Sequence, residues 1–299
     1  MVPRVAIPSS GDHSNEIVRP VTSSIDGFGM THTLIDTALD LAREAAALAA
    51  DRRRGIVEVA DLKTSSVDVV TAVDREIEAL IRRRLAERQP GDGFLGEEGG
   101  RAERSTSLTW VVDPIDGTVN YLYGIPQYAI SIAVVEGDPS PQGWQEVAGV
   151  VIDVCSGREF TATRGGGAFA NGVPLSVNRP ESLGQSLLST GFSYSQQIRT
   201  QQAQVMAVVM PHVRDIRRMG AASLDLAALA AGQLDIYFER MLQPWDHAAG
   251  VLIAREAGAE VRGWNGSAPD IDWLLASHPD VIDEIESVLV AAGAHFDFR

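Results

Sequence analysis

The stretch WVVDPIDGTVNY, residues 110–121, carries the strongest structural signal in the chain. Apolar and aromatic residues typical of a buried strand lead directly into two aspartates, Asp113 and Asp116, with Pro114 and Ile115 between them. Proline fixes its own φ, so we expect a tight turn in which both carboxylates and the Ile115 carbonyl face one point. Carboxylates repel each other and resist burial, and a positive group is therefore expected between them.

The same stretch continues with Gly117 and Thr118, whose backbone N–H groups are expected to form a nest for phosphate oxygens. Acidic ligands for a metal beside donors for a phosphate are the combination that metal-assisted phosphate hydrolysis needs. An isolated Asp-x-x-Asp pattern is more often a turn with solvated charges. Three further acidic stretches weaken that simpler interpretation, because each lies at the edge of a regular element. They are residues 63–74, 96–99 and 245–250.

Four of these acidic side chains offer hard oxygen ligands, which suit Mg²⁺, Mn²⁺ or Ca²⁺ better than Zn²⁺. They are Glu97, Asp113, Asp116 and Asp246. The sequence contains no clustered cysteines and histidines to support a zinc site. Taken alone, Asp246 also fits an N-cap for the helix that is expected to follow it.

The charge balance argues against general nucleic-acid binding. The chain of 299 residues has a net charge of -15, whereas nucleic-acid binding needs a basic surface. An anionic substrate would then need a local positive centre, most simply a metal ion. With one cysteine, no intramolecular disulfide is possible. No apolar run approaches the ~20 residues of a membrane span, and the N-terminus lacks the apolar core of a signal peptide, so we expect a cytoplasmic enzyme or binding protein.

Residues 1–30 are rich in proline, serine and glycine without a regular period. They predict a disordered N-terminal arm, or a misplaced start, since Met30 precedes the first patterned segment. The expected helices span residues 33–50, 72–87, 199–213, 224–231, 248–257 and 281–292. The expected strands span residues 94–95, 108–112, 128–135, 147–154, 159–162, 235–239, 259–262 and 273–277. This order favours a layered α+β or α/β body.

Taken together, the motifs make the chain resemble the inositol monophosphatase family, within the wider lithium-sensitive, magnesium-dependent phosphatase superfamily. The resemblance covers roughly residues 33–290, and the motifs occur in the family's order and spacing. The Asp-Pro-Ile-Asp-Gly-Thr block followed by Trp-Asp-x-Ala-Ala-Gly is highly specific. The matching blocks are Lys63…Asp68-Val69-Val70-Thr71…Asp74, Gly96-Glu97-Glu98, residues 110–121, and Trp245-Asp246-His247-Ala248-Ala249-Gly250.

The resemblance implies a five-layer α-β-α-β-α sandwich of the inositol monophosphatase and fructose-1,6-bisphosphatase type, usually as a homodimer. The catalytic domain would span residues 31–299, divisible into a metal- and phosphate-binding half, 31–180, and a substrate-binding half, 181–299. Roughly two to three Mg²⁺ ions per site are implied, with Mn²⁺ able to substitute. The implied metal ligands are Glu97, Asp113, the Ile115 carbonyl, Asp116 and Asp246.

The resemblance also implies roles in catalysis and substrate binding. Glu97 and Thr118 would orient the attacking water, and Asp74 would hold Thr118 through a proton link. The backbone N–H groups of Gly117 and Thr118 would hold the phosphate. The positions that would line the rest of the substrate are Asp116, Gly220, Ala222, Glu239 and Asp246.

The reaction expected from this resemblance is hydrolysis of a small phosphate monoester, with inositol 1-phosphate as the best substrate. Histidinol phosphate, fructose 1,6-bisphosphate and 3′-phosphoadenosine 5′-phosphate are rivals on the same chemistry. Phe192 falls near a position where inositol-phosphate enzymes tend to carry a small polar residue, which puts the identity of the sugar or polyol in doubt.

A different class of function is a regulatory binding protein of the same fold, since some bacterial relatives act as partners of the transcription machinery. The complete set of acidic ligands and Thr118 favours the enzyme, because a pure binding role would not need them. We therefore expect a phosphorylated polyol or sugar as substrate, with no nucleic-acid or membrane partner.

Overall fold

The computed structural model of the chain describes residues 25–55, 59–62, 69–102, 104–138 and 140–295. Helix α1 (Ile25–Arg53) begins inside the segment predicted to be a disordered arm, so residues 25–30 are helical in the structure. Residues 1–24 lie outside the described residues. The same is true of Lys63 and Asp68, two positions of the first acidic block.

An eight-stranded sheet forms the first half of the molecule, with strand order β10-β9-β8-β7-β6-β5-β3-β4. Strands β3 and β5 run parallel, and every other pairing in this sheet is antiparallel. Its strands are β3 (Gly93–Gly96), β4 (Gly100–Ala102), β5 (Leu108–Asp116), β6 (Ala129–Gly137), β7 (Trp144–Asp153), β8 (Arg158–Thr163), β9 (Gly167–Ala170) and β10 (Val173–Pro174). A separate hairpin pairs β1 (Val59–Leu62) with β2 (Val69–Thr71).

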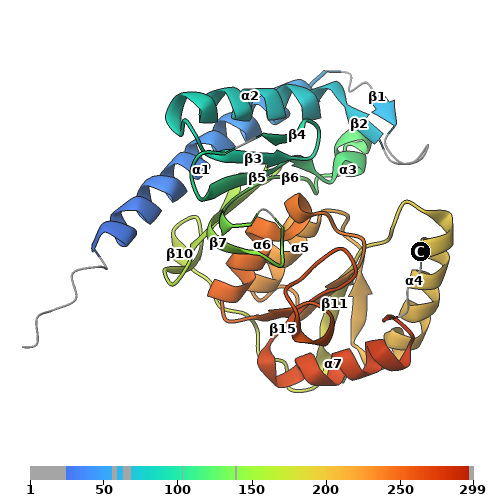
Figure 1. Cartoon of the computed structure of the whole chain (residues 1–299). Helices are drawn as coiled ribbons and strands as arrows, with labels where there is room; N and C mark the ends of the chain where they lie inside the picture. Colours follow the sequence, from blue (N-terminus) through green and yellow to red (C-terminus); the bar gives the residue numbers. More distant parts are fainter. Residues whose placement is uncertain (1–24, 56–58, 63–68, 103, 139, 296–299) are drawn as a thin grey trace, which may run out of the picture.

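Two helices cover one face of this sheet, as their apolar spacing predicts (Figure 1). Helix α1 buries Ala38, Leu41 and Ala45, and α2 (Ala72–Arg88) buries Ile77 and Ile81, in one cluster with the sheet. Within that cluster β5 contributes its residues in alternation, because successive side chains of a strand point to opposite faces.

Helices α5 (Ala222–Ala230) and α6 (Pro244–Glu256) pack against the opposite face. Helix α6 lies directly on the sheet because Gly149 of β7 has no side chain. A Cβ at Gly149 would lie 3.0 Å from the carbonyl oxygen of Ala249. Where α6 meets α5, a Cβ at Gly250 would lie 2.7 Å from Leu226 Cβ. The two glycines therefore set the spacing of the middle layer.

A five-stranded sheet lies beyond this helix pair, in the order β12-β11-β13-β15-β14. Its strands are β11 (Leu187–Thr190), β12 (Asp215–Arg217), β13 (Ile236–Glu239), β14 (Glu260–Arg262) and β15 (Leu274–Ser277). One face packs on α5 and α6, and the other packs on α4 (Gln196–Val209) and α7 (Pro279–Ala291). Three short 3₁₀ segments are described, Leu183–Gln185, Met210–His212 and Trp264–Gly266.

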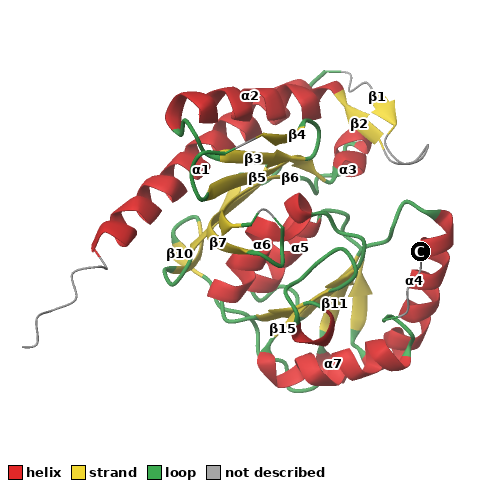
Figure 2. Cartoon of the chain, viewed as in Figure 1, coloured by secondary structure: helices red, strands yellow, loops and turns green. Residues whose placement is uncertain are grey.

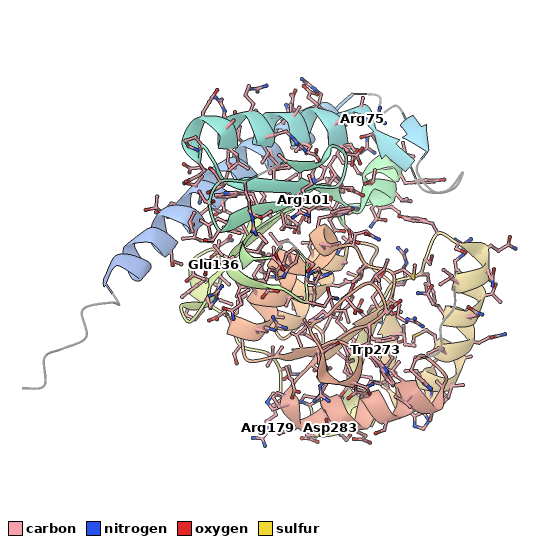
Figure 3. The ribbon with its side chains drawn as sticks, viewed as in Figure 1. Arg75, Arg101, Glu136, Arg179, Trp273 and Asp283 are labelled. Carbon is pink, nitrogen blue, oxygen red and sulfur yellow. The ribbon has the colours of Figure 1, made fainter. Side chains whose placement is uncertain are left out.

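The layers run α1/α2, eight-stranded sheet, α5/α6, five-stranded sheet and α4/α7, which confirms the expected α-β-α-β-α sandwich (Figure 2). Charged side chains such as Arg179 and Asp283 lie at its periphery, whereas Trp273 is enclosed in the second half (Figure 3). No helix within the described residues combines the length and apolar character needed to span a bilayer.

Candidate active site

Asp113 and Asp116 lie on a bulged strand and not on the tight turn that proline suggested. Strand β5 continues to Asp116, but its register with β6 shifts: Asp113 pairs with Ser131, and Asp116 pairs with Ala129. Three steps on β5 therefore match two on β6, which is a β-bulge with one extra residue. Pro114 is accommodated there because a bulge needs no ladder N–H from it.

The bulge has a consequence for the two carboxylates. In a regular strand, residues three apart point to opposite faces, whereas the extra residue restores a common face. Val112 and Ile115 both join the cluster under α1 and α2. Asp113 and Asp116 accordingly belong to the opposite side, toward the middle helix layer, where they are only 2% and 7% exposed.

Gly117 turns the chain from β5 into the short helix α3 (Thr118–Tyr123) with φ 89°, in the left-handed region that favours glycine. A Cβ there would lie 2.9 Å from the carbonyl oxygen of Gln127 and 3.2 Å from that of Gly220. Asn120 holds this close approach, because its side-chain amide donates to the carbonyl oxygens of Gln127 at 2.8 Å and Met219 at 2.9 Å. The structure thus brings two predicted substrate stretches, at Gly117 and Gly220, together.

Thr118 and Asp74 meet although they are 44 residues apart in the chain. Thr118 Oγ1 lies 3.2 Å from Asp74 Oδ1 and 3.0 Å from the Ile115 carbonyl oxygen. Asp74 is fully buried at the start of α2, where its other carboxylate oxygen accepts hydrogen bonds from the backbone N–H and the hydroxyl of Thr71. This capping box fixes the Asp74 side chain, so that only Oδ1 is directed at Thr118.

Asp116 reaches from the sheet to the first turn of α5. Its carboxylate accepts hydrogen bonds from the backbone N–H groups of Ala222 at 3.2 Å and Ser223 at 2.8 Å, and from the Ser223 hydroxyl. Burial raises the pKa of Asp116, and these hydrogen bonds oppose the rise because they favour the charged form. The positive end of the helix also favours a carboxylate in this position.

Asp246 is the third residue of α6 and not its N-cap, which is Gln243; in the capping box its Oδ2 accepts the backbone N–H of Gln243 at 2.7 Å. Burial raises the pKa of Asp246 well above its ordinary value, and the negative charges of Glu97 and Asp116 raise it further. Glu97 follows β3, in a turn that is fixed by Glu78 of α2. The Glu78 carboxylate accepts the backbone N–H groups of Glu98 and Gly99, each at 2.7 Å.

Glu239 ends β13 on the far side of the site. It accepts a hydrogen bond from the Tyr237 hydroxyl at 2.6 Å, and burial raises its pKa to about 7. Asp225 of α5 accepts from the Ser189 hydroxyl at 3.0 Å. Burial raises the pKa of Asp225 well above its ordinary value, and the negative charge of Glu239 is the second largest cause of the rise. Carboxylates from both halves of the molecule therefore share one region of negative potential.

The predicted ligands approach from three directions: Asp113 and Asp116 from β5, Glu97 from the turn after β3, and Asp246 from α6. Among the described residues, no three acidic, histidine or cysteine side chains are arranged tightly enough to enclose a metal ion as they stand. The donor set nevertheless suits a hard divalent cation, because all its members are oxygens. Burial raises the pKa of Asp116 and of Asp246, and the charges of Glu97 and Asp116 add to the rise at Asp246.

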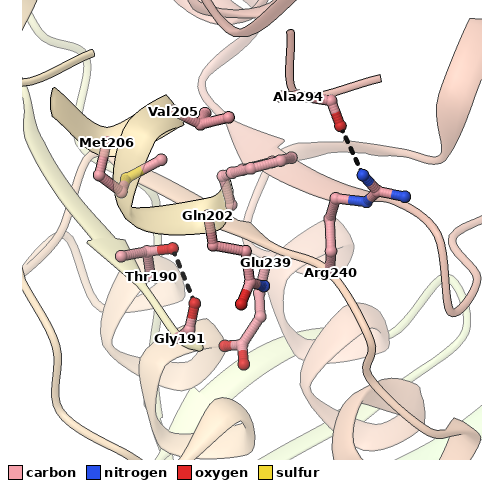
Figure 4. A pocket seen from close by; sticks show the side chains of 9 residues that line it. Thr190, Gly191, Gln202, Val205, Met206, Glu239, Arg240 and Ala294 are labelled. Atoms are coloured by element: carbon pink, nitrogen blue, oxygen red, sulfur yellow. Dashed lines mark hydrogen bonds between the residues drawn. The ribbon is translucent and has the colours of Figure 1, made fainter. Parts of the chain in front are cut away.

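A pocket opens beside Glu239 and is lined by α4, β11 and β13 (Figure 4). Met206, Val205 and Phe238 make its wall apolar, and Glu239 supplies a carboxylate. Arg240 points away from Glu239 and donates to the carbonyl oxygen of Ala294 at 2.8 Å (Figure 4). Phe192, which stands where a polar residue was expected, packs against the apolar cluster under α4 and α7.

Several residues of this region were not singled out from the sequence. Asn120 lies within the motif of residues 110–121 and Ser223 follows Ala222, but both residue types have common structural roles, so neither carries a signal of its own. Asp225 had a signal, because an acid within the apolar helix Ala222–Ala230 must be buried or at an edge. Tyr237 and Arg218 had no such signal, because their positions beside Glu239 depend on the fold alone.

The five-layer sandwich and its acidic region define the fold class of the inositol monophosphatases and their relatives. The sequence model of the inositol monophosphatase family matches residues 30–293, and the chain belongs to this family. The resemblance inferred from the four motif blocks is thereby confirmed.

Particular relatives are similar over most of their length. The chain is 43% identical over 275 residues to inositol-1-monophosphatase SuhB of Mycobacterium tuberculosis, covering 86% of this chain and 93% of that protein. It is 37% identical over 247 residues to Nus factor SuhB of Xylella fastidiosa, covering 79% and 87%. Among solved structures, extragenic suppressor protein suhB of Bartonella henselae superposes with a TM-score of 0.79 at 32% identity, covering 86% of this chain and 98% of that one.

Proposed function

We propose that the protein is a Mg²⁺-dependent phosphatase that hydrolyses inositol 1-phosphate to myo-inositol and phosphate. The observation that carries this proposal is the junction of the bulged strand β5 with α2, α5 and α6. There a partly buried Thr118–Asp74 pair lies beside Asp246, whose pKa is raised by burial and by the negative charges of Glu97 and Asp116. Family membership supports phosphatase activity.

Glu97, Asp113, the Ile115 carbonyl, Asp116 and Asp246 would hold roughly two to three Mg²⁺ ions, with Mn²⁺ as a substitute. The fit rests on charge: buried carboxylates that repel one another are stabilised when a divalent cation lies between them. When bound, such ions lower the pKa of water and neutralise the charge of the phosphate dianion and of the departing alkoxide.

The residues of the chain would position the reactants. The backbone N–H groups of Gly117 and Thr118 bind phosphate oxygens at the left-handed turn before α3. Glu97 and Thr118 orient a water molecule in line with the ester bond. As the water oxygen bonds to phosphorus, its proton passes to Thr118 Oγ1, whose own proton moves to Asp74 Oδ1 at 3.2 Å. The ester P–O bond breaks, the alkoxide takes up a proton from solvent water, and Asp74 gives its proton back to solvent, so that the alcohol and phosphate are released.

The polyol would lie between Gly220, Ala222 and Glu239. The Glu239 carboxylate accepts one hydrogen bond from Tyr237 and retains acceptor capacity for substrate hydroxyls. Asp116 and Asp246 would lie at the phosphate end of the same substrate. Histidinol phosphate, fructose 1,6-bisphosphate and 3′-phosphoadenosine 5′-phosphate remain rival substrates on this chemistry.

The proposal is tested by measuring phosphate release from these four compounds with Mg²⁺, with excess EDTA, and with Mg²⁺ plus millimolar Li⁺. We expect inositol 1-phosphate to be hydrolysed with the highest kcat/KM, activity to vanish in EDTA, and Li⁺ to inhibit. Full activity in EDTA would contradict the metal dependence. A higher kcat/KM for one of the rival compounds would change the assigned substrate but not the proposed reaction type.

A regulatory role is a second candidate, because the relative from Xylella fastidiosa is named a Nus factor. The enzyme is favoured, since identity is higher to the relative named inositol-1-monophosphatase, 43% against 37%. We place either activity in the cytoplasm, in a homodimer. The two roles are separated by returning an Asp113→Asn variant to the host after deletion of the gene. Full rescue by this variant would favour regulation, and loss of rescue would favour catalysis.

A further inference from the structure

Arg218 lies at the entrance of the candidate site, in the segment between β12 and α5. The side chain is exposed and lies over Gly220. A Cβ built at Gly220 would be 2.5 Å from Arg218 Nη1 and 3.0 Å from the side-chain nitrogen of Asn120. Because Asn120 holds this loop against α3, the guanidinium is carried next to the turn at Gly117 where the phosphate is expected.

The guanidinium of Arg218 makes no hydrogen bond or ion pair with any of the described residues, although it faces acidic neighbours. The next residue along the chain behaves differently, since Arg217 Nη1 is paired with Asp215 at 2.6 Å. Arg240 is also engaged, because its guanidinium binds the carbonyl oxygens of Asp272 and Ala294. Arg218 is therefore a cation in this region with all its donors available.

The charge of Arg218 acts on the substrate end of the site. Burial raises the pKa of both Glu239 and Asp225, and Arg218 is the arginine that opposes the rise in each case. The substrate end of the site thus combines the Glu239 carboxylate, which accepts hydrogen bonds, with the Arg218 guanidinium, which only donates them. A pair of neighbouring hydroxyl groups matches this combination, because one hydroxyl can donate to Glu239 while the other accepts from Arg218.

A second anionic group on the substrate would fit less well. Glu239, Asp225 and Asp116 lie close to this position, and each of them repels a second anionic group whenever its carboxyl is ionised. A neutral, hydroxyl-rich alcohol avoids that repulsion and still uses the fork of Arg donors.

We propose that Arg218 is a substrate-binding residue that, together with Glu239, selects phosphate esters of alcohols with neighbouring hydroxyl groups. The proposal deepens the proposed function and rests on it. Arg218 takes no part in proton transfer, so it contributes to binding of the alcohol and leaves the chemical step to Thr118 and Asp74.

The test compares Arg218→Ala and Arg218→Lys with the control Arg217→Ala. The control also removes one positive charge, but from the neighbouring residue, whose side chain is paired with Asp215. For inositol 1-phosphate, we expect Arg218→Ala to raise KM about tenfold with kcat nearly unchanged, the loss expected for a charge-assisted hydrogen bond. The KM of Arg218→Lys should lie between the values of the wild type and Arg218→Ala, because the lysine ammonium keeps the charge but lacks the fork of donors. For p-nitrophenyl phosphate, which lacks hydroxyls on its leaving group, KM should stay unchanged in all three variants.

Calorimetric binding of inositol 1-phosphate with Ca²⁺ in place of Mg²⁺ tests the same contact without turnover. Weaker binding by Arg218→Ala and normal binding by Arg217→Ala would support the proposal. Equal binding by all proteins, no binding by the wild type, or the same KM change with p-nitrophenyl phosphate would overturn it. A loss of affinity that appears only where size-exclusion chromatography shows a changed oligomeric state would also overturn it. Failure of the proposed function is distinct, since it would appear as absence of Mg²⁺-dependent phosphate release from the wild type.

Discussion

At the residue scale, Thr118 stands out because its hydroxyl lies within reach of two acceptors. Its Oγ1 lies within hydrogen-bond distance of Asp74 Oδ1 and of the Ile115 carbonyl oxygen. A hydroxyl has a single proton and two lone pairs, so it can donate to one of these groups while accepting from a water. The capping box keeps Asp74 from turning away, so the fold would set the direction of the proposed proton transfer.

We expect Thr118→Ala to lower kcat by ~10²–10⁴-fold with little change in KM, because orienting the water matters mainly in the transition state. Asp74→Asn should cost a similar factor. Its amide oxygen would stay with Thr71, and its amide nitrogen would force Thr118 to accept. The double variant should cost little more than either change alone. Steady-state kinetics at saturating Mg²⁺ test this, and normal turnover of Thr118→Ala would remove the residue from the mechanism.

Asp246→Asn should separate catalysis from stability. Turnover should fall by more than ~10²-fold, because a proposed metal ligand is lost. The unfolding free energy of the metal-free protein should stay the same or rise by about 1 kcal/mol, since burial and Glu97 both disfavour the charged form of Asp246. Thermal melting measures this change. The amide oxygen can still accept the Gln243 N–H. Asp36→Asn, on the exposed face of α1, is the control and should change neither property. A large loss of stability in Asp246→Asn would show that this acid is structural.

The acids at Glu97, Asp113 and Asp246 were predictable as candidates because each follows an apolar run or an aromatic residue in the sequence. Their partners were not, since the hydrogen bond between Asp116 and Ser223 joins residues 107 apart in the chain. Asp225 and Arg218 acquire their surroundings only when α5 packs between the two sheets. Such pairings depend on tertiary contacts that local pattern does not contain.

At the scale of elements, β5 shows where sequence reasoning stopped. Its apolar run predicted a strand to Val112, and proline favoured a turn afterwards, but β6 continues to pair beyond that point. The neighbouring strand overrides the local preference by taking the extra residue into a bulge. Long helices with a clear apolar stripe were predicted well, whereas short strands such as β4, β11 and β12 were missed because three or four residues carry little periodicity.

Gly149→Ala is expected to destabilise the protein by roughly 1–3 kcal/mol, because overpacking forces backbone to move. The new methyl group would lie 3.0 Å from the Ala249 carbonyl oxygen and 3.2 Å from its Cα, pushing α6 from β7. Gly184→Ala is the matched control, since its Cβ would meet no atom within 4 Å. Urea denaturation measures both. Equal midpoints for the two variants would mean that α6 does not rest on Gly149 in solution.

At the scale of the whole molecule, the acidic region makes stability depend on pH. Glu239 has its pKa raised to about 7, so between its ordinary value and pH 7 the folded protein binds more protons than the unfolded chain. Stability of the metal-free protein should therefore fall as pH rises through this range, by about 3 kcal/mol for this group alone. Glu239→Gln should flatten the profile.

Mg²⁺ should reverse that trend. Protons and metal compete for the same carboxylates, so added Mg²⁺ should raise the melting temperature more at pH 8 than at pH 6. Scanning calorimetry with and without EDTA at the two values tests the expectation. A metal-free protein that is more stable at pH 8 would contradict the assigned burial of these acids.

The proposed active site lies where β5, α2, α5 and α6 meet, so its activity should depend on how the two halves pack together. Asp113, Asp116 and Thr118 come from the first half, whereas Asp246 and Glu239 come from elements around the second sheet. A sub-ångström slip of α5 and α6 between the sheets would leave every helix and strand intact and still separate these groups. Mild denaturant should therefore abolish phosphatase activity at concentrations that leave the circular dichroism signal unchanged. Dilution of the denaturant should restore the activity immediately. Loss of activity would then report altered packing of α5 and α6 between the two sheets before any helix or strand is lost.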